Sequence, residues 1–320
     1  MMESETLVVL GTGGTIAGRA SSRDDHVGYR AGEVAVDDLL HGIELPAGWH
    51  VDAEQVAQVD SKDMGPAVWR ALLGRLRHHL ARPEVRGIVI THGTDTLEET
   101  AYLLQRVLAP AKPVVLTCAM RPATALAPDG PQNLADALLV AREPGACGVV
   151  AVCAGRIHSG LEVRKVHHYR TDAFDSGDAG PLGWVEQGTC TLSRHWPATL
   201  PEQDSALCDR LLAAVRWPRV ECLFSHGGAD GWLVRALLAQ DRAGRDRDDG
   251  LRGLVVAGTG NGTLHADLVA ALLEARAAGI EVRRTTRCAS GRVIGAGGDA
   301  IEAVALPPAQ ARLALLLGLL

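Results

Sequence analysis

The sequence predicts an α/β protein in which a mostly parallel sheet is covered by helices on both faces. Short apolar, β-branched runs alternate with segments of helical periodicity along most of the chain. Glycine is abundant, with 36 residues, whereas aromatic residues make up only 3%, so packing must rely on Ala, Val and Leu. The length of 320 residues favours two domains or one large domain.

The first part of the chain alternates strands and helices in a regular order. Apolar runs predict strands over residues 7–10, 51–59, 87–90, 113–117 and 149–153. Helical periodicity predicts helices over residues 66–81, 97–109 and 133–142. Pro66 suits the first turn of its helix, and Thr96, followed three residues later by Glu99, predicts a helix cap.

The second part resumes the alternation after an irregular stretch. Residues 188–218 contain three prolines and little regular patterning beyond a helical stretch at 205–215. Further strands are predicted at 220–224, 253–257 and 281–286, and further helices at 231–240, 266–278 and 309–319. The charged residues 241–249 predict a solvated loop. The predicted domains are residues 1–190 and 219–320, joined by a linker at 191–218.

Composition excludes several classes of function. The net charge is −6 and acidic residues are interspersed with basic ones, which disfavours a nucleic-acid partner. No apolar run is long enough to cross a membrane and residues 1–6 lack the pattern of an export signal, so we expect a cytoplasmic protein. Seven cysteines without a C-x-x-C pair predict reduced, mostly buried thiols and no metal site.

Common nucleotide-binding and hydrolase motifs are missing. The glycine loop at 11–16 has Ile16 where a dinucleotide fingerprint needs a small residue. Only three of the 32 basic residues are lysines, Lys62, Lys112 and Lys165, and none follows a glycine as a P-loop requires. No G-x-S-x-G elbow and no H-E-x-x-H helix occurs. Lys112, beside a proline at the start of a strand, is expected to be solvated.

Threonines beside glycines gather at the predicted strand ends. The loops at 11–15, 60–64 and 91–96 each follow a predicted strand, and the carboxyl ends of parallel strands meet at one edge of a sheet. A threonine hydroxyl becomes a nucleophile when a neighbour takes its proton and backbone N–H groups stabilise the oxyanion. Gly-Thr turns are also common without any catalytic role. Two such loops favour catalysis, and the residues alone leave open which threonine attacks first.

These two loops resemble the signature motifs of the bacterial-type L-asparaginases, the asparaginase/glutaminase family. The motifs read TGGTIAG at residues 12–18 and HGTDTLEETA at residues 92–101. Further matching segments follow in order over most of the chain, at 60–64, 119–122, 129–134, 180–183 and 260–262. The resemblance implies a larger N-terminal domain with a flavodoxin-like sheet and a smaller α/β C-terminal domain. It also implies a homotetramer built as a dimer of dimers.

The resemblance further implies a reaction and a role for each site residue. The reaction is the hydrolysis of L-asparagine to L-aspartate and ammonia through an acyl-enzyme on threonine, without a cofactor. The implied catalytic residues are Thr12 as nucleophile, Tyr29 in a glycine-flanked lid, Thr94 as the residue that activates water, and its partners Asp95 and Lys165. The implied substrate-binding residues are Asp60, Ser61, Thr94, Asp95, Ala119 and, from a neighbouring chain, Asn261 and Asp299.

Two positions depart from the family pattern. Lys62 stands where many relatives carry a neutral or acidic side chain, so we expect it to point away from the substrate or to pair with Asp63 or a partner chain's carboxylate. Residues 295–299 contain no glutamate to bind the substrate ammonium, and Asp299 has a shorter side chain. One methylene is worth only about 1–3 kcal/mol in a pocket, so the ratio of the two activities cannot be read from the sequence. We predict that asparagine is preferred and glutaminase activity is minor.

Two other functions stay open at this stage. An amidohydrolase subunit that serves another enzyme would need an appended partner-binding domain, for which 320 residues leave little room. The second alternative is a non-catalytic family member that keeps the fold as an interaction scaffold. The joint presence of Thr12, Tyr29, Thr94, Asp95 and Lys165 argues against a scaffold.

Overall fold

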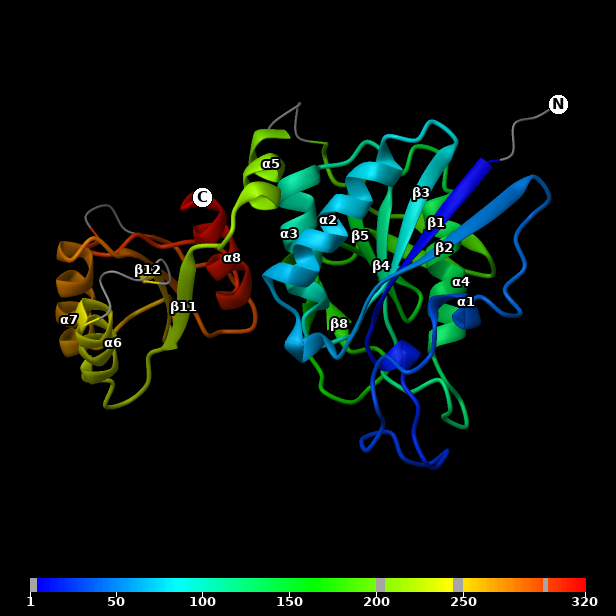
Figure 1. Ribbon diagram of the computed structural model, residues 1–320. Helices are drawn as coiled ribbons and strands as arrows, with labels where there is room; N and C mark the ends of the chain where they lie inside the picture. The colour runs from blue at the N-terminus through cyan, green and yellow to red at the C-terminus, as the bar shows by residue number, and fades with distance from the viewer. Residues whose placement is uncertain (1–4, 200–204, 244–249, 296–298) are drawn as a thin grey trace. The chain divides into compact units, whose positions relative to one another are not determined.

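The computed structural model describes residues 5–199, 205–243, 250–295 and 299–320 (Figure 1). The chain divides into two compact units, Met1–Cys208 and Asp209–Leu320, each with its own sheet. The stretch 191–218, predicted as a linker, carries the end of strand β10 (Thr189–Leu192) and helix α5 (Ser205–Ala213).

The first unit is built on an eight-stranded sheet in the order β10-β9-β6-β5-β4-β3-β1-β2. Its parallel strands are β1 (Glu5–Gly13), β2 (Trp49–Val59), β3 (Val85–Thr91), β4 (Val114–Thr117) and β5 (Val149–Cys153). Their spatial order, β2-β1-β3-β4-β5, is the order of flavodoxin-like sheets. The predicted mostly parallel sheet is therefore confirmed.

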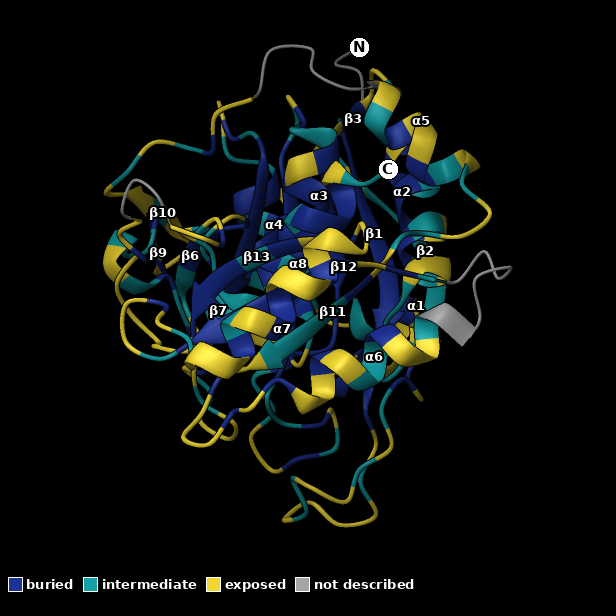
Figure 2. Ribbon diagram, turned by 90° about the vertical axis from the view of Figure 1, so that its left-hand side faces the viewer, coloured by how far each residue is buried: buried dark blue, intermediate teal, exposed yellow. Residues whose placement is uncertain are grey.

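Helices cover both faces of this sheet (Figure 1). α1 (Val36–Leu39) and α4 (Gly130–Ala141) share a buried cluster with Leu7 and Val9 of β1. α2 (Pro66–Leu80) and α3 (Leu97–Leu108) lie on the opposite face. Alternate side chains of a strand point to opposite faces, so the wholly apolar run 7–10 is buried on both. Figure 2 shows the buried colour on β1 and on the strands beside it. Burial of each such side chain contributes about 1.5–3 kcal/mol.

Two predicted boundaries move in ways that matter for the site. β1 continues past residue 10 to Gly13, which pairs with Val59 of β2, so Thr12 belongs to the end of the strand. A side chain at Gly13 would collide with the Val59 backbone, which explains the glycine. α4 begins at Gly130, three residues before the predicted start, because Pro131 occupies the first turn without needing a hydrogen-bond acceptor.

The remaining strands of the first unit are short and antiparallel. β6 (Arg156–Ser159), β9 (Gly183–Glu186) and β10 extend the sheet beyond β5, and β7 (Arg164–Lys165) pairs with β8 (Phe174–Asp175). None was predicted from the sequence, because each has only two to four residues and lacks the continuous apolar run that marks the equally short β4.

The second unit holds a parallel three-stranded sheet in the order β11-β12-β13. Its elements are β11 (Arg219–Phe224), α6 (Trp232–Ala243), β12 (Leu251–Gly258), α7 (Ala266–Ala277), β13 (Glu281–Thr286) and α8 (Pro308–Gly318). The strands and helices predicted here are confirmed within a few residues. The loop predicted at 241–249 is wrong for 241–243, because α6 continues through them, and 244–249 lie outside the described residues.

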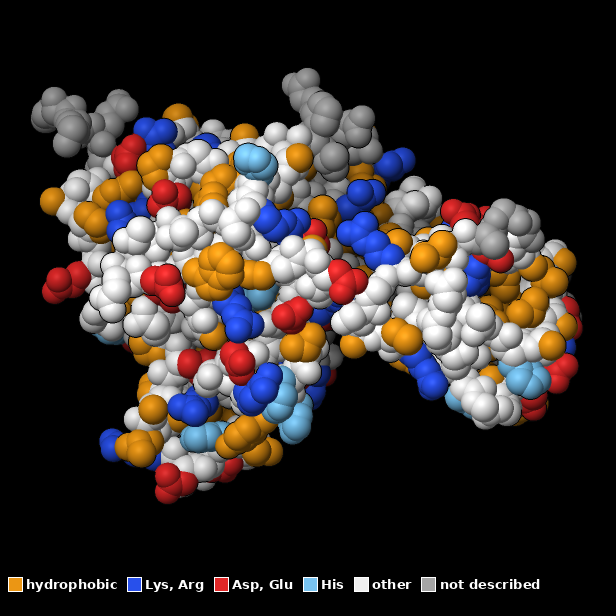
Figure 3. All heavy atoms as spheres, turned by 180° about the vertical axis from the view of Figure 1, so that it is seen from behind, with side chains coloured by type: hydrophobic (Ala, Val, Ile, Leu, Met, Phe, Trp, Pro, Cys, Tyr) orange, Lys and Arg blue, Asp and Glu red, His pale blue; other side chains and the backbone are white. Residues whose placement is uncertain are grey.

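Surface features agree with the composition. Acidic and basic side chains are interspersed over the face shown in Figure 3, as 38 acidic and 32 basic residues would predict. No helix among the described residues is both long and apolar enough to span a bilayer.

Candidate active site

The three loops predicted to lie together are in contact at the carboxyl ends of β1, β2 and β3. A Cβ atom added to Gly14 would collide with the backbone of Gly93, and one added to Gly93 would collide with the side chain of Ser61. Gly14 has φ 81°, which favours glycine as well. The site therefore lies at the switch point between β1 and β3, where flavodoxin-like sheets bind ligands.

Thr12 lies at this edge of the sheet and is almost fully buried, with 1% of its surface exposed. Its hydroxyl donates a hydrogen bond of 2.9 Å to the backbone oxygen of Thr91 on β3. The Gly14 N–H donates to the backbone oxygen of Val59 at 2.9 Å, which fixes the chain just after Thr12. The family resemblance implies that Thr12 is the nucleophile. These bonds fix its side chain against β3 and the following backbone against β2.

Lys165 joins the second threonine loop to strand β7. Its Nζ atom donates to Thr94 Oγ1 at 2.8 Å and to Asp95 Oδ1 at 2.6 Å. The side chain of Lys165 is only 17% exposed, whereas that of Asp95 is 53% exposed. The structure therefore brings three predicted catalytic residues together, although Lys165 lies 71 residues after Thr94. A lysine this close to a hydroxyl can exchange a proton with it.

Tyr29 lies against the first threonine loop. Its hydroxyl and Thr15 Oγ1 are 2.5 Å apart, so the contact that the structure gives Tyr29 is with Thr15, whereas the resemblance assigned it to Thr12. Burial raises the pKa of the Tyr29 hydroxyl above its usual value. Arg19 and Arg30 exchange two backbone hydrogen bonds and close the base of the intervening segment.

Asp60 and Lys62 form an ion pair beside the site. Lys62 Nζ lies 2.6 Å from Asp60 Oδ2 and 3.3 Å from Asp63 Oδ2. The predicted pairing with Asp63 is confirmed, and the pairing with Asp60 was missed. The two carboxylates hold the pKa of the Lys62 ammonium above its ordinary value, so the cation facing this loop is neutralised by its neighbours.

Ser61 connects its own loop, at 60–64, to the loop at 91–96. It is buried, its Oγ accepts the Asp95 N–H at 3.1 Å, and its backbone oxygen accepts the Thr96 hydroxyl at 2.7 Å. Thr96 does occupy the N-cap position of α3, but its side chain makes no capping bond. The predicted capping role of this hydroxyl is therefore wrong, because the hydroxyl is directed to the backbone oxygen of Ser61, to which it donates its hydrogen bond.

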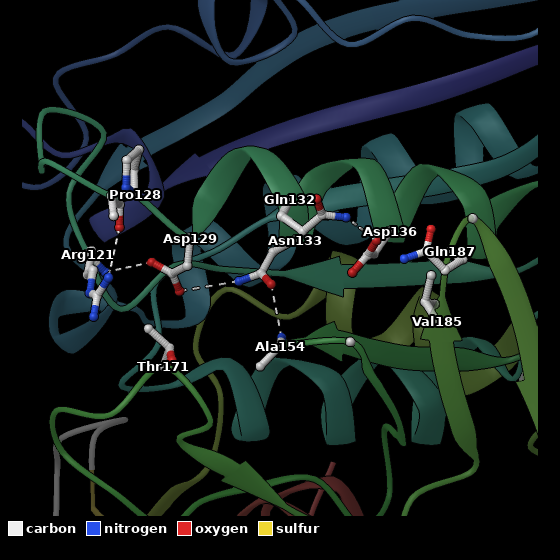
Figure 4. A pocket seen from close by; sticks show the side chains of 13 residues that line it. Arg121, Pro128, Asp129, Gln132, Asn133, Asp136, Ala154, Thr171, Val185 and Gln187 are labelled. Atoms are coloured by element: carbon white, nitrogen blue, oxygen red, sulfur yellow. Dashed lines mark hydrogen bonds between the residues drawn. The ribbon is translucent and has the colours of Figure 1, made fainter.

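Ala119 is buried and lies in a segment held by the start of α4. Asp129 accepts the backbone N–H groups of Met120 and Arg121, both at 2.9 Å. Asn133 donates to the Cys118 backbone oxygen at 2.9 Å and accepts the Ala154 N–H at 2.9 Å, which joins the ends of β4 and β5 (Figure 4).

Asp129 and Asn133 also line a cavity of about 780 Å³ in the first unit. Both belong to the matching segment 129–134 but received no role from the sequence. Their spacing of four residues, one helical turn, places both side chains on the same face of a helix. This was the signal in the sequence that could have identified them.

His92 links the loop at 91–96 to helix α3 through its two ring nitrogens. It is fully buried, with Nδ1 2.8 Å from the Gly93 backbone oxygen and Nε2 2.9 Å from Thr100 Oγ1. The carbonyl requires a proton on Nδ1, so Nε2 accepts from Thr100, which itself accepts from Trp69 Nε1 at 2.8 Å. Burial lowers the pKa of His92 to about 4, which keeps the ring neutral.

Asn261 and Asp299 belong to the second unit. The Asn261 side chain donates to the Ile294 backbone oxygen at 2.9 Å and accepts the Ile294 N–H at 2.8 Å. Asp299 pairs with Arg284, which also donates to the backbone oxygens of Asn261 and Gly262. The structure thus places these two predicted residues around one arginine. Residues 296–298, part of the stretch that lacks the expected glutamate, lie outside the described residues.

Two expectations about reactive side chains are revised. Lys112 is not simply solvated, because its Nζ donates to the Arg82 backbone oxygen at 2.6 Å and burial lowers its pKa. None of the seven cysteines, all of them among the described residues, forms a disulfide in the structure, but only three are buried, fewer than predicted, and Cys288 is exposed. In the part of the chain that the structure describes, no group of His, Cys, Asp or Glu is arranged to hold a metal ion.

Comparisons with known proteins agree with this geometry. Residues 6–198 match the family described as "Asparaginase, N-terminal", and residues 219–320 match "Glutaminase/Asparaginase C-terminal domain". The chain is 35% identical over 288 residues to a glutaminase-asparaginase of Pseudomonas fluorescens biotype A, covering 89% of this chain and 76% of that protein. It is 34% identical over 320 residues to L-asparaginase 2 of Bacillus subtilis, covering 97% and 81%.

A solved structure is also similar over nearly the whole length. The crystal structure of a probable cytoplasmic L-asparaginase from Campylobacter jejuni has a TM-score of 0.88 and 33% identity, covering 98% of this chain and 95% of that one. Since the two family patterns together span most of the sequence and the relatives exceed 30% identity, the chain belongs to the asparaginase/glutaminase family.

Proposed function

We propose that this protein is an L-asparaginase that hydrolyses L-asparagine to L-aspartate and ammonia, with minor activity on L-glutamine. The observation that carries the proposal is Lys165, whose Nζ contacts both Thr94 and Asp95 in a loop that touches the loop of Thr12. Relatives named L-asparaginase and glutaminase-asparaginase support the substrate class. Hydrolysis needs water alone as co-reactant, so no cofactor is proposed.

In the proposed first step, Thr12 Oγ1 attacks the carbon of the side-chain amide. A bond forms between Oγ1 and that carbon, the carbon–nitrogen bond breaks, and the hydroxyl proton leaves with the amine as ammonia. The Thr12 hydroxyl must first give up its bond to the Thr91 backbone oxygen. Tyr29 and Thr15, whose oxygens lie 2.5 Å apart, are the hydroxyl pair proposed to assist this proton transfer.

In the proposed second step, water attacks the acyl-enzyme. Thr94 orients the water, and Lys165, acting in this step as a neutral amine held in place by Asp95, takes up one water proton through the Thr94 hydroxyl. A bond forms between the water oxygen and the acyl carbon, the bond from that carbon to Thr12 Oγ1 breaks, and the proton passes on to Oγ1. The products are L-aspartate and the restored Thr12 hydroxyl. Loss of a positioned acid–base group of this kind costs about 10²–10⁴ in rate.

Substrate binding is proposed to involve both units. Ser61 and Asp60 would face the α-carboxylate and its surroundings, Asp95 the α-ammonium group, and Ala119 the side-chain amide. Asn261 and Asp299 would be supplied by a neighbouring chain in a homotetramer, which remains a prediction, as does the cytoplasmic location.

The proposal is tested by ammonia release from L-asparagine and L-glutamine. Wild type is expected to act on both, with asparagine preferred, whereas Thr12→Ala and Thr94→Ala lose at least about 100-fold in kcat. Thr191→Ala, which removes an exposed threonine of β10, is the control and is expected to keep wild-type activity.

Each outcome has a defined meaning. No release from either amide by wild type would contradict the enzymatic function and favour the scaffold alternative. Full activity of Thr12→Ala would show that the nucleophile is another residue. In Thr94→Ala, mass spectrometry is expected to find an aspartyl group on the peptide that contains Thr12.

A further inference from the structure

Glu98 contacts the backbone of Lys165. It lies in the first turn of α3, four residues after Thr94, and its Oε2 accepts the Lys165 N–H at 2.6 Å. The two residues are 67 positions apart in the sequence. Lys165 is therefore held at both ends: its backbone by Glu98 of α3, and its ammonium group by Thr94 and Asp95 of the loop that leads into this helix.

Strand β7 needs such an anchor. It consists of two residues, Arg164 and Lys165, and pairs only with the equally short β8 within the described chain. A strand that pairs over only two residues is held less firmly than the strands of five or more residues in the main sheet. A bond from a rigid helix to the Lys165 N–H supplies the missing constraint and sets the direction in which the side chain leaves the strand.

The helix dipole gives a simpler reason for an acidic residue here. Carboxylates in the first turn of a helix are stabilised by about 0.3–1 kcal/mol whatever else they contact. Glu98 and Glu99 both lie in that turn, so this explanation would apply to each of them. Burial raises the pKa of Glu98, so placing a charged carboxylate at this position carries a desolvation cost. The hydrogen bond from the Lys165 N–H offsets part of that cost.

We infer that Glu98 is a positioning residue that fixes Lys165 so that its Nζ atom reaches Thr94 and Asp95 at the same time. The inference rests on the proposed roles of Thr94 and Lys165. Removing the Glu98 side chain would free the backbone of β7 without touching a reacting atom. A displacement of about 1 Å in such an arrangement can cost about 100-fold in rate.

The test compares three variants of the full-length protein. Glu98→Ala is expected to lower kcat by at least about 30-fold with KM within about twofold, because Lys165 is displaced while the substrate still binds. Glu98→Gln is expected to stay within about fivefold of wild type, since the amide oxygen accepts the same N–H. Glu99→Gln, the matched charge removal one residue later, is expected to stay within about twofold.

Three kinetic results would overturn the inference. They are a wild-type kcat for Glu98→Ala, a loss in Glu98→Gln as large as that in Glu98→Ala, or an equal loss in Glu99→Gln. A crystal structure of Glu98→Ala gives a readout that does not depend on activity. It is expected to show Lys165 Nζ moved away from Thr94, and an unmoved Nζ would also overturn the inference. An inactive wild type would instead contradict the proposed function, which separates the two failures.

Discussion

The site consists of two small groups of side chains, each joined by short hydrogen bonds. Thr94, Asp95 and Lys165 form one group, and Thr15 and Tyr29 form the other. The first was implied by the family resemblance, but the second was not, because the resemblance linked Tyr29 to Thr12. Hydroxyl pairs leave no periodic pattern in a sequence, so only the structure could identify Thr15 as the partner of Tyr29.

The pairing of Tyr29 with Thr15 predicts coupled effects on rate. Tyr29→Phe and Thr15→Val each remove one hydroxyl of the pair, and each is expected to lower kcat by about 10-fold or more. Because the hydroxyls act together, the double variant is expected to lose little more than either single variant. The measurement is kcat for all four proteins in a double-mutant cycle. Fully multiplicative losses would show that the two hydroxyls act independently.

The buried His92 predicts a loss of stability in mild acid. Its pKa falls from 6.5 to about 4 in the folded protein, so between these pH values the unfolded chain binds a proton that the folded chain does not. The free energy of unfolding therefore decreases as the pH falls from 6.5 towards 4, by about 3 kcal/mol from this residue.

Thermal unfolding at several pH values between 7 and 4 measures this effect. His92→Gln removes the titrating group, so its unfolding midpoint is expected to depend less steeply on pH than that of wild type. An unchanged slope in His92→Gln would mean that other groups cause the acid sensitivity.

At the scale of elements, the site depends on the close approach of two turns. Gly14, after β1, and Gly93, after β3, leave no room for a side chain between them. The sequence predicted that these loops share one edge of the sheet, because parallel order follows from the alternation of strands and helices. It did not predict their contact, which depends on the backbone conformation of Gly14.

Replacing Gly14 by alanine tests this contact against a matched control. Gly14 and Gly42 have φ values of 81° and 82°, but an added Cβ meets nothing within 4 Å at Gly42 and collides with Gly93 at Gly14. Gly42→Ala is expected to cost about 1 kcal/mol of unfolding free energy, and Gly14→Ala about 3 kcal/mol or more with loss of activity. Equal costs, measured by denaturant unfolding, would show that the turns can separate freely.

The elements with a continuous apolar run were predictable and the short polar ones were not. Strands β1, β3, β4, β5 and β12 contain apolar runs whose burial on both faces leaves a clear pattern. β7 has two residues, Arg164 and Lys165, and both are charged, so nothing in its composition marks a strand. Its position comes from contacts distant in sequence, including the bond from Glu98.

At the scale of the whole molecule, the predicted catalytic and substrate-binding residues are divided between two units with separate cores. Thr12, Ser61 and Lys165 belong to the first unit, and Asn261 and Asp299 to the second. The proposal that a neighbouring chain supplies the second set requires a stable oligomer. Light scattering is expected to show a tetramer, and a stable, active monomer would contradict the shared site.

Mixing two inactive variants tests the shared site directly. Thr12→Ala and Asn261→Ala are each expected to lose most activity when alone. If sites are shared, denaturing and refolding them together restores about a quarter of wild-type activity, because half of randomly mixed pairs contain one intact site. Ammonia release measures the recovery. No recovery, with oligomers present, would place both residues in the site of a single chain.

The scarcity of lysine has a practical consequence for attaching this protein to a support. Lys112 and Lys165 are partly buried and hydrogen-bonded, whereas Lys62 has a side chain that is 61% exposed. Of the three lysine side chains, Lys62 is therefore the most accessible to an amine-reactive linker, and coupling there, next to Ser61, would abolish the charge that neutralises Asp60 and Asp63. Immobilisation through Lys62 would tether the chain by the loop that we propose binds the substrate, so a linker directed at an engineered residue on another surface is the better choice.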